Sequence, residues 1–296
     1  MYIGRFAPSP TGPLHFGSLV TAVASYLDAR SNQGKWLLRM EDLDKPRELA
    51  GAAANIISTL EAYGFEWSDT IMYQSQRNDT YERVLATLKE MQYVYPCTCT
   101  RKEIADSSEQ TGIEGIIYPK TCLYQLIKEH HPIAWRIKTP DKSIHFNDAV
   151  YGDIKQNLHS EIGDFVLKRA DGQFAYQLAV VVDDAEQGVT NIVRGADLLN
   201  STTRQIYLQQ LLGFTQPNYM HIPIVTNTLG QKLSKQTLAT PILVSEANRS
   251  LWQALLFLNQ KPPESLRHET LNQLWNWAIS HWQAELIASK SSIPTL

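Results

Sequence analysis

Several features that mark other protein classes are missing from this 296-residue sequence. No apolar run approaches the about 20 residues that cross a bilayer, and the N-terminus has neither a basic region nor a small-residue cleavage site. Charged residues make up only 19% of the chain, and a net charge of −3 does not indicate a nucleic-acid-binding surface. We therefore expect a cytoplasmic globular protein in which any RNA contact rests on a local basic patch.

Cysteine is also scarce, with only Cys97, Cys99 and Cys122 present. Without a secretion signal these residues do not predict a disulfide framework. Three thiols close in sequence are instead suitable ligands for a tetrahedral zinc ion, with reduced cysteines that bind no metal as the alternative. A fourth ligand is needed, and chemistry alone favours His130 or His131, because imidazole is the commoner ligand.

What the sequence does contain is an alternating pattern typical of a parallel α/β layer. Strands are predicted at residues 2–6 and 35–40, and helices at residues 14–30 and 46–64. Strand, helix, strand, helix is the order expected when helices cover a parallel sheet. The fold class predicted is therefore α/β.

The pattern changes after a predicted helix at residues 80–91 and becomes a mixture of short strands up to about residue 171, which indicates an insertion. The α/β order resumes with the apolar segments 174–182 and 191–193, a helix at 201–213 and a strand at 220–225; the rest looks helical and ends in a polar tail at 290–295. We expect a first catalytic half at 1–95, an insertion at 96–173, a second catalytic half at 174–235 and a C-terminal helical region at 236–296. No heptad pattern argues against a monomer.

A Gly/Pro-rich turn lies where the first strand meets the first helix, at Pro8–Ser18. A helix N-terminus there would offer free N–H groups and the positive end of its dipole to a phosphate chain, and glycine would let the ligand approach the backbone. His15 and Gly17 stand at this helix start. Taken alone, the segment could equally be a Pro-rich loop before a helix with a capping serine.

A second constellation, Lys232-Leu233-Ser234-Lys235, follows Gly230 in a polar segment. Two lysines flanking a hydroxyl can neutralise the charge that builds on the β- and γ-phosphates as pyrophosphate leaves. Alone the tetrapeptide could be an ordinary solvated loop. Its pairing with the His15 segment makes a nucleotide site the stronger interpretation.

These two segments resemble the HIGH and KMSKS motifs of class I aminoacyl-tRNA synthetases. Two further pairs of segments are similar to the glutamyl enzyme: 5–12 and 39–44 resemble its opening and its acidic motif, and 176–184 and 192–197 resemble its amino-acid pocket. The resemblance implies a Rossmann-like class I catalytic domain. It most closely fits the glutamyl-queuosine tRNA(Asp) synthetases, shortened relatives of glutamyl-tRNA synthetase.

The resemblance also implies roles for individual residues. Arg5 and Arg194 would bind the two carboxylates of L-glutamate, because guanidinium can grip a carboxylate with two parallel hydrogen bonds. Glu41 would take the ammonium group. The remaining glutamate contacts would come from Phe6, Ala7, Pro8, Ser9 and Tyr176. For each of these residues the alternative is an ordinary salt bridge or a buried tyrosine.

His15 and Lys235 are the implied catalytic residues and would stabilise the transition state at the α-phosphate of ATP. The ATP would be bound with Mg²⁺. Activation of glutamate would not require tRNA. The other ATP contacts would be Gly17, Ser18, Lys232 and Ser234. Two departures stand out. Ser18 replaces the second histidine of HIGH, and Ala196-Asp197-Leu198 replaces a Glu-Asp-His run, so we transfer no role to that run.

For the metal, the resemblance selects Tyr118 as the fourth zinc ligand beside the three cysteines. The ion would be structural and would hold the insertion in shape against the tRNA.

The acceptor follows from resemblance alone. The chain continues from Lys235 only to Leu296, too short a segment for the helical domains with which a full glutamyl-tRNA synthetase reads the anticodon. We therefore expect no anticodon-binding domain and transfer of glutamate to the queuosine base of tRNA(Asp). The alternatives are a truncated glutamyl-tRNA synthetase that charges a tRNA 3′ end, a different HxGH-type nucleotidyltransferase and a non-catalytic RNA-binding paralogue.

Overall fold

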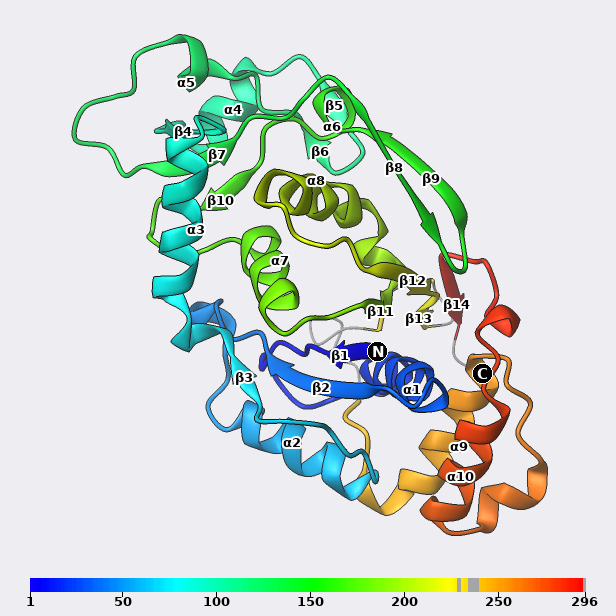
Figure 1. The fold of residues 1–296 in the computed structure, drawn as a ribbon. Helices are drawn as coiled ribbons and strands as arrows, with labels where there is room; N and C mark the ends of the chain where they lie inside the picture. Colours follow the sequence, from blue (N-terminus) through cyan, green and yellow to red (C-terminus); the bar gives the residue numbers. More distant parts are fainter. Residues whose placement is uncertain (228–229, 234–239, 295–296) are drawn as a thin grey trace.

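The first half of the α/β layer follows the predicted order closely. The computed structural model describes residues 1–227, 230–233 and 240–294 (Figure 1). Strands β1 (Ile3–Phe6), β2 (Lys35–Met40) and β3 (Met72–Tyr73) form a parallel sheet in the order β1-β2-β3. Helix α1 (Phe16–Ser31) connects β1 to β2 and buries Leu19, Val20, Val23 and Leu27, whose spacing of three and four residues places them on one face.

The helix predicted from Pro46 begins later than expected. Pro46 lies in a 3-10 turn, Lys45–Arg47, and helix α2 covers Ala52–Ala62. Gly51 has a φ of 78°, a left-handed conformation that interrupts a right-handed helix. Helix α3 (Asn78–Glu90) then leads out of the layer, close to its predicted range.

The second half is a parallel pair, β11 (Asn191–Gly195) and β12 (Asn218–Ile222), with helices α7 (Tyr176–Glu186) and α8 (Thr202–Leu212). The apolar segment 174–182 lies mostly in α7, whose residues 177–184 are all buried. The predicted strand at 220–225 is divided at Pro223 into β12 and β13 (Ile224–Thr226), because proline cannot donate to a strand ladder.

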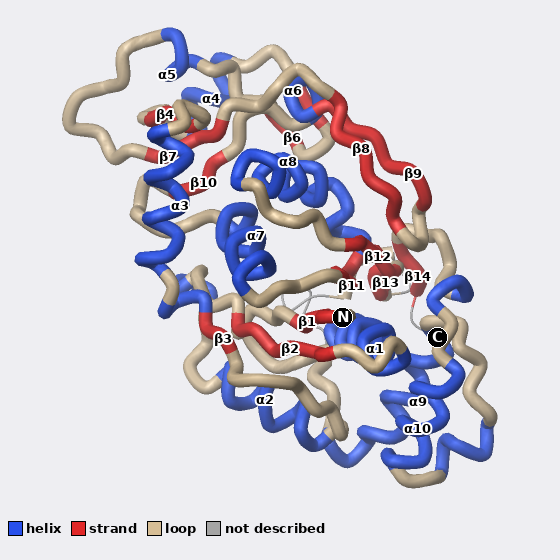
Figure 2. The backbone as a smooth tube through the Cα atoms, viewed as in Figure 1, coloured by secondary structure: helices blue, strands red, loops and turns tan. Residues whose placement is uncertain are grey.

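The two halves meet at the start of β1. The Thr190 N–H donates to the Ile3 carbonyl at 2.9 Å, and the Ile3 N–H donates to Thr190 Oγ1 at 2.9 Å. Helix α1 contacts both β1 and β11, while α7 and α8 lie on the other side of β11 in Figure 2. The carboxyl ends of the parallel strands from both halves therefore face a common region.

The insertion contains a small antiparallel sheet in the order β10-β7-β4. The elements of the insertion as a whole are β4 (Val94–Cys97), α4 (Arg101–Ser107), β5 (Thr111–Gly112), β6 (Gly115–Ile116), α5 (Thr121–Tyr124), β7 (Ala134–Ile137), α6 (Leu158–Glu161) and β10 (Val166–Lys168).

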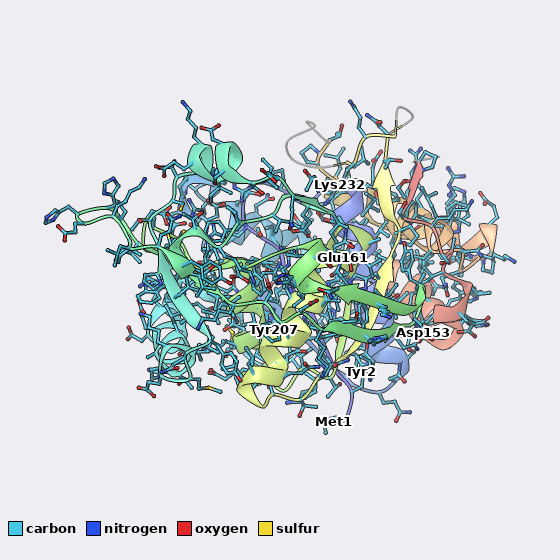
Figure 3. All side chains as sticks on the ribbon, turned by 90° about the horizontal axis from the view of Figure 1, so that it is seen from above. Met1, Tyr2, Asp153, Glu161, Tyr207 and Lys232 are labelled. Atoms are coloured by element: carbon cyan, nitrogen blue, oxygen red, sulfur yellow. The ribbon has the colours of Figure 1, made fainter. Side chains whose placement is uncertain are left out.

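A long hairpin, β8 (Ser143–Asp148) and β9 (Gly152–Asn157), lies within the range expected for the insertion but joins the sheet of the second half. Strand β8 pairs with β12 where Tyr219 meets Asp148. Asp153 marks the turn end of the hairpin in Figure 3. The hairpin thus brings its turn to the α/β layer.

Helices α9 (Ala247–Phe257) and α10 (Leu271–His281) pack against α1 and confirm the helical character predicted for this region. The indole N–H of buried Trp275 donates to the Tyr63 carbonyl at 2.9 Å. The polar tail contains a short strand, β14 (Ser292–Pro294), parallel to β13. The composition of the tail did not predict this strand, because strands pair through backbone groups that every residue carries. In the described part of the chain, no helix has both the length and the apolar character of a membrane span.

Candidate active site

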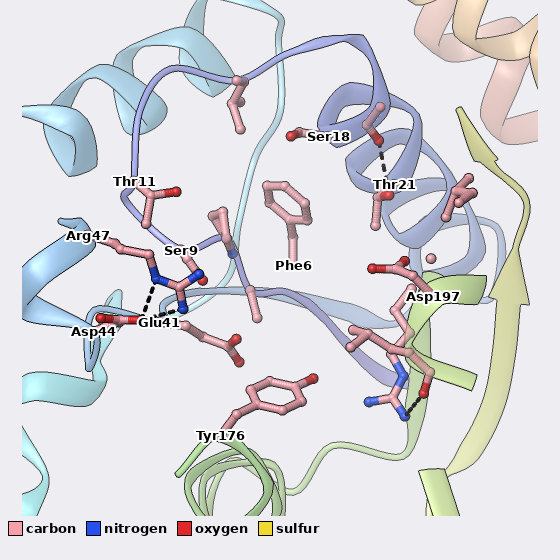
Figure 4. Close-up of a pocket in the computed structure, with 18 of the residues that line it drawn as sticks. Phe6, Ser9, Thr11, Ser18, Thr21, Glu41, Asp44, Arg47, Tyr176 and Asp197 are labelled. Carbon is pink, nitrogen blue, oxygen red and sulfur yellow. Dashed lines mark hydrogen bonds and ion pairs between the residues drawn. The ribbon is translucent and has the colours of Figure 1, made fainter. Parts of the chain in front are cut away.

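A cleft of about 980 Å³ opens at the carboxyl ends of β1 and β11 (Figure 4). In parallel α/β sheets this edge is where ligands bind, because the loops that follow the strands converge there. Most of the predicted site residues line this one cleft: Arg5, Phe6, Ala7, Pro8, Ser9, His15, Gly17, Ser18, Glu41, Tyr176, Arg194 and Lys232. Ser234 and Lys235 lie outside the described residues.

His15 caps the N-terminus of α1. Its Nδ1 accepts a hydrogen bond from the Ser18 N–H at 3.3 Å, and its Nε2 lies 3.1 Å from Ser18 Oγ. Because Nδ1 accepts, the proton of the neutral ring belongs on Nε2. A Cβ at Gly17 would lie 3.2 Å from the His15 ring. His15 is therefore the N-cap of α1, and Gly17 leaves space for the His15 ring because it has no Cβ.

Lys232 also lines the cleft and forms an ion pair with Asp197, which follows β11. The segment is held to β13 by the Leu233 N–H, which donates to the Val225 carbonyl at 2.8 Å. Sequence reasoning gave Asp197 no role, since it lies in the run that departs from the family pattern. The structure makes it the side chain that anchors Lys232.

A buried ion cluster forms the floor beneath Arg5. The Asp184 carboxylate accepts from Arg5 Nε at 3.0 Å and from Arg39 Nη1 at 2.8 Å, and Arg39 Nη2 lies 3.4 Å from Glu41. Burial alone would raise the pKa of Asp184, but Arg39 and Arg5 outweigh it and lower the pKa below its ordinary value. Within the described residues, Arg5 Nη1 makes no hydrogen bond, so this nitrogen remains for a ligand.

Arg194 has different surroundings. Its guanidinium donates to Gln205 Oε1 at 2.8 Å, Thr202 Oγ1 at 2.8 Å and His221 Nε2 at 3.0 Å. Within the described residues every acceptor of Arg194 is uncharged, the more distant Leu198 carbonyl included. Its side chain is thus held in place while its charge has no carboxylate in direct contact.

Tyr176 and Glu41 line the same cleft as the two arginines, and Figure 4 draws both side chains. Burial raises the pKa of Tyr176, which keeps it a neutral phenol that can donate. Burial also raises the pKa of Glu41, although Arg39 and Arg5 oppose that effect. A cation that reached Glu41 would lower this pKa and favour the charged carboxylate.

The three cysteines come together in the insertion, with sulfur atoms within 4.8 Å of one another. Cys97 lies at the end of β4 and Cys122 in α5. Burial raises the pKa of the Cys122 thiol, but the hydrogen bonds of Tyr118 and Thr98 outweigh it and lower the pKa to about 7. The thiolate, which is the form that binds metal, is therefore accessible near neutral pH.

The Tyr118 hydroxyl completes this group. It lies 3.3 Å from Cys97 Sγ and 3.5 Å from Cys99 Sγ. Zinc binds sulfur at about 2.3 Å and oxygen at about 2.0–2.2 Å, so the sulfur-to-oxygen edge of a tetrahedral site is about 3.5 Å. His130 and His131 are exposed and do not belong to the described cluster. The three thiols, with the phenol beside them, are therefore a donor set that could hold zinc.

Comparison with known proteins gives a consistent result. The family described as tRNA synthetases class I (E and Q), catalytic domain, matches residues 3–256. Among curated proteins, the chain is 52% identical to a glutamyl-Q tRNA(Asp) synthetase of Aromatoleum aromaticum, over 95% of this chain and 89% of the relative. It is 53% identical to one of Neisseria gonorrhoeae, over 97% of each. Among solved structures, a glutamate tRNA ligase from Elizabethkingia meningosepticum in complex with its amino acid shares the fold, with a TM-score of 0.80, 24% identity and coverage of 100% of this chain and 67% of the other.

Proposed function

The chain belongs to the glutamyl-Q tRNA(Asp) synthetase family within the class I tRNA synthetases, and from this premise we propose that it activates L-glutamate with ATP and Mg²⁺ and passes the glutamyl group to the queuosine base of tRNA(Asp). Family membership makes it a ligase that transfers glutamate to tRNA. The proposal goes beyond family membership in two parts, which are the adenylate intermediate and the base that accepts glutamate.

Glutamate recognition is assigned to the pocket between β1, β11 and α7. Arg194 takes one substrate carboxylate, because it is buried and donates to uncharged acceptors alone within the described residues. Arg5 offers Nη1 to the other carboxylate, and Glu41 takes the ammonium group. Tyr176 donates its hydroxyl within the same pocket. Phe6, Ala7, Pro8 and Ser9 form the wall along which the amino acid lies.

Activation joins this pocket to the nucleotide site. A substrate carboxylate oxygen attacks the α-phosphorus of ATP; the new C–O–P bond forms as the bond from α-phosphorus to pyrophosphate breaks, and pyrophosphate leaves with the electron pair. His15 and Lys235 stabilise the charge on the α-phosphate, while Gly17, Ser18, Lys232 and Ser234 hold the phosphate chain. The queuosine hydroxyl then attacks the glutamyl carbonyl, its proton is released, and AMP leaves.

One observation carries the proposal: a single cleft is lined both by the His15 helix start with Lys232 and by Arg5, Glu41, Tyr176 and Arg194. A phosphate site and a receptor for a dicarboxylate amino acid thus lie within reach of each other. Adenylation needs that juxtaposition, because the reacting oxygen and phosphorus must be held about 3–3.5 Å apart.

Glutamate-dependent exchange of labelled pyrophosphate into ATP, measured without tRNA, tests the activation step. We expect exchange with glutamate and little with glutamine or aspartate, since an amide cannot pair with Arg194 and a shorter side chain cannot span from Arg194 to Arg5. Absence of exchange with glutamate would contradict the proposal, and equal exchange with glutamine would contradict the assigned pocket.

We also propose that Cys97, Cys99, Tyr118 and Cys122 hold one structural zinc ion. The thiol and phenol donors suit it, and their spacing matches a tetrahedral site. The ion would tie the end of β4 to α5 and stabilise the insertion; it takes no part in the glutamate chemistry.

Removal of the phenol tests this metal site. Tyr118→Phe should raise the zinc dissociation constant by at least about tenfold, the loss that even outer-shell partners of a ligand produce. His131→Ala, on an exposed residue outside the cluster, is the matched control and should bind like the unchanged protein. Metal content after competition with a chelator measures both. Weaker zinc binding by His131→Ala with unchanged binding by Tyr118→Phe would contradict this assignment and make His131 the fourth ligand.

A further inference from the structure

We propose that Asp148 and His221 are positioning residues that hold Arg194 ready for the substrate carboxylate by fixing the tautomer of one buried imidazole. The inference rests on the proposed role of Arg194 and deepens it. It assigns a function to two side chains on the far side of the arginine from the cleft, neither of which lines the cleft.

The first step is the anchoring of Asp148 at the turn end of β8. Its Oδ1 accepts the backbone N–H groups of Val150 and Tyr151, both at 3.0 Å. Its Oδ2 accepts the His221 backbone N–H at 3.1 Å and lies 2.6 Å from His221 Nδ1. The Asp148 residue is 1% exposed. Backbone N–H groups thus donate to both oxygens, which favours an ionised carboxylate that accepts at each. Against the effect of burial, these contacts with His221 and the turn lower the pKa of Asp148.

The second step is the tautomer of His221, which is fully buried at 0% exposure. Because Nδ1 faces an anion that can only accept, the proton of the neutral ring must lie on Nδ1. Nε2 then carries a lone pair, and this lone pair faces Arg194 Nε at 3.0 Å. The opposite tautomer would direct an N–H against the N–H of Arg194.

The third step is the consequence for Arg194. A carboxylate at the position of His221 would also hold the Arg194 guanidinium. It would, however, form an ion pair with the guanidinium and compete with the substrate carboxylate for that positive charge. Asp148 therefore lies one imidazole away, where it orients the ring without touching the arginine. Gln205, Thr202 and the more distant Leu198 carbonyl are the other uncharged acceptors of Arg194 among the described residues. The arrangement fixes the direction of the guanidinium and leaves its charge for a ligand.

Asp148→Asn is the discriminating variant. An asparagine whose oxygen keeps the two turn N–H groups presents its NH₂ group to His221 Nδ1, so the ring proton must move to Nε2 and oppose Arg194. We expect the KM for glutamate in pyrophosphate exchange to rise at least tenfold, with the KM for ATP unchanged within twofold. Asp153→Asn, the same chemical change at an exposed position on the same hairpin, should leave both constants unchanged.

His221→Gln gives an independent test. Its amide oxygen can accept from Arg194 without any tautomer, so this variant should retain a KM for glutamate closer to that of the unchanged protein than Asp148→Asn does. Adding Asp148→Asn to His221→Gln should then raise the KM by less than twofold, because no ring remains to be oriented. Additive effects of the two changes would overturn the proposal.

The tautomer can also be read in the unmodified protein by ¹⁵N NMR of its histidine side chains, even if a variant fails to fold. We expect His221 to be neutral with its proton on Nδ1 at neutral pH; a proton on Nε2 or on both nitrogens would overturn the inference. Equal changes in the constants for glutamate and ATP in Asp148→Asn would indicate general damage and would also refute it. If the unmodified protein shows no glutamate-dependent exchange, the proposed activity fails, while the NMR result still decides the tautomer.

Discussion

Arg194→Lys should lower kcat/KM for glutamate in the exchange reaction by about 100-fold, mostly through KM. Lysine offers a compact ammonium that cannot donate at once to Gln205, Thr202 and His221 and still meet a substrate carboxylate. Truncating one partner of a buried charged contact costs about 2–5 kcal/mol, and about 3 kcal/mol corresponds to about 100-fold.

Arg169→Lys is the matched control for that variant. Arg169 also lines the cleft, but its side chain is 44% exposed and pairs with Asp171. An exposed ion pair of this kind contributes little free energy, so kcat/KM for glutamate should change by less than about threefold. Similar losses in both variants would mean that the pocket recognises glutamate elsewhere.

Asp184→Asn, in the buried ion cluster beneath Arg5, should be strongly destabilising and lower the melting temperature by about 10 °C. It would leave Arg5 and Arg39 buried without their shared carboxylate, and breaking a buried ion pair costs about 3–5 kcal/mol. Asp69→Asn, which removes the partner of exposed Lys35, should shift the midpoint by no more than about 2 °C. Thermal unfolding by circular dichroism measures both.

The effect of Asp184→Asn should depend on pH. Arg39 and Arg5 hold the pKa of Asp184 below its ordinary value in the folded protein, against the effect of burial. A group with a lowered folded pKa contributes stability above its unfolded pKa and loses it as pH falls through the folded pKa. The difference between the two proteins should therefore be largest at neutral pH and shrink below about pH 4. A constant difference would mean that the variant acts through packing alone.

Much of the fold could be predicted because its signals are local. Residues 35–40 form the strand that their apolar run predicted, and the first helix lies within about two residues of its predicted ends at each terminus. Where prediction was less accurate, backbone chemistry explains the difference. Gly51 makes α2 begin later, Pro223 divides a strand, and β14 pairs with β13 through the main chain although it lies in a tail predicted as polar.

The candidate site divides in the same way. Arg5, Glu41, Tyr176 and Arg194 were predicted to bind glutamate because they stand in motifs that resemble those of a known family, and the structure brings them to one cleft. His221 and Asp148 carried no such signal, because their contact joins residues 73 positions apart in the sequence. Only the fold brings the turn end of the β8–β9 hairpin to β12.

Transfer of labelled glutamate to tRNA tests the central claim most directly. The protein would be incubated with ATP and labelled glutamate, in parallel with tRNA from cells that contain queuosine and with tRNA from cells that lack it. We predict label on the queuosine-containing tRNA alone. Equal label on both tRNA samples would indicate charging of a 3′ end and would contradict the account, as would label on neither.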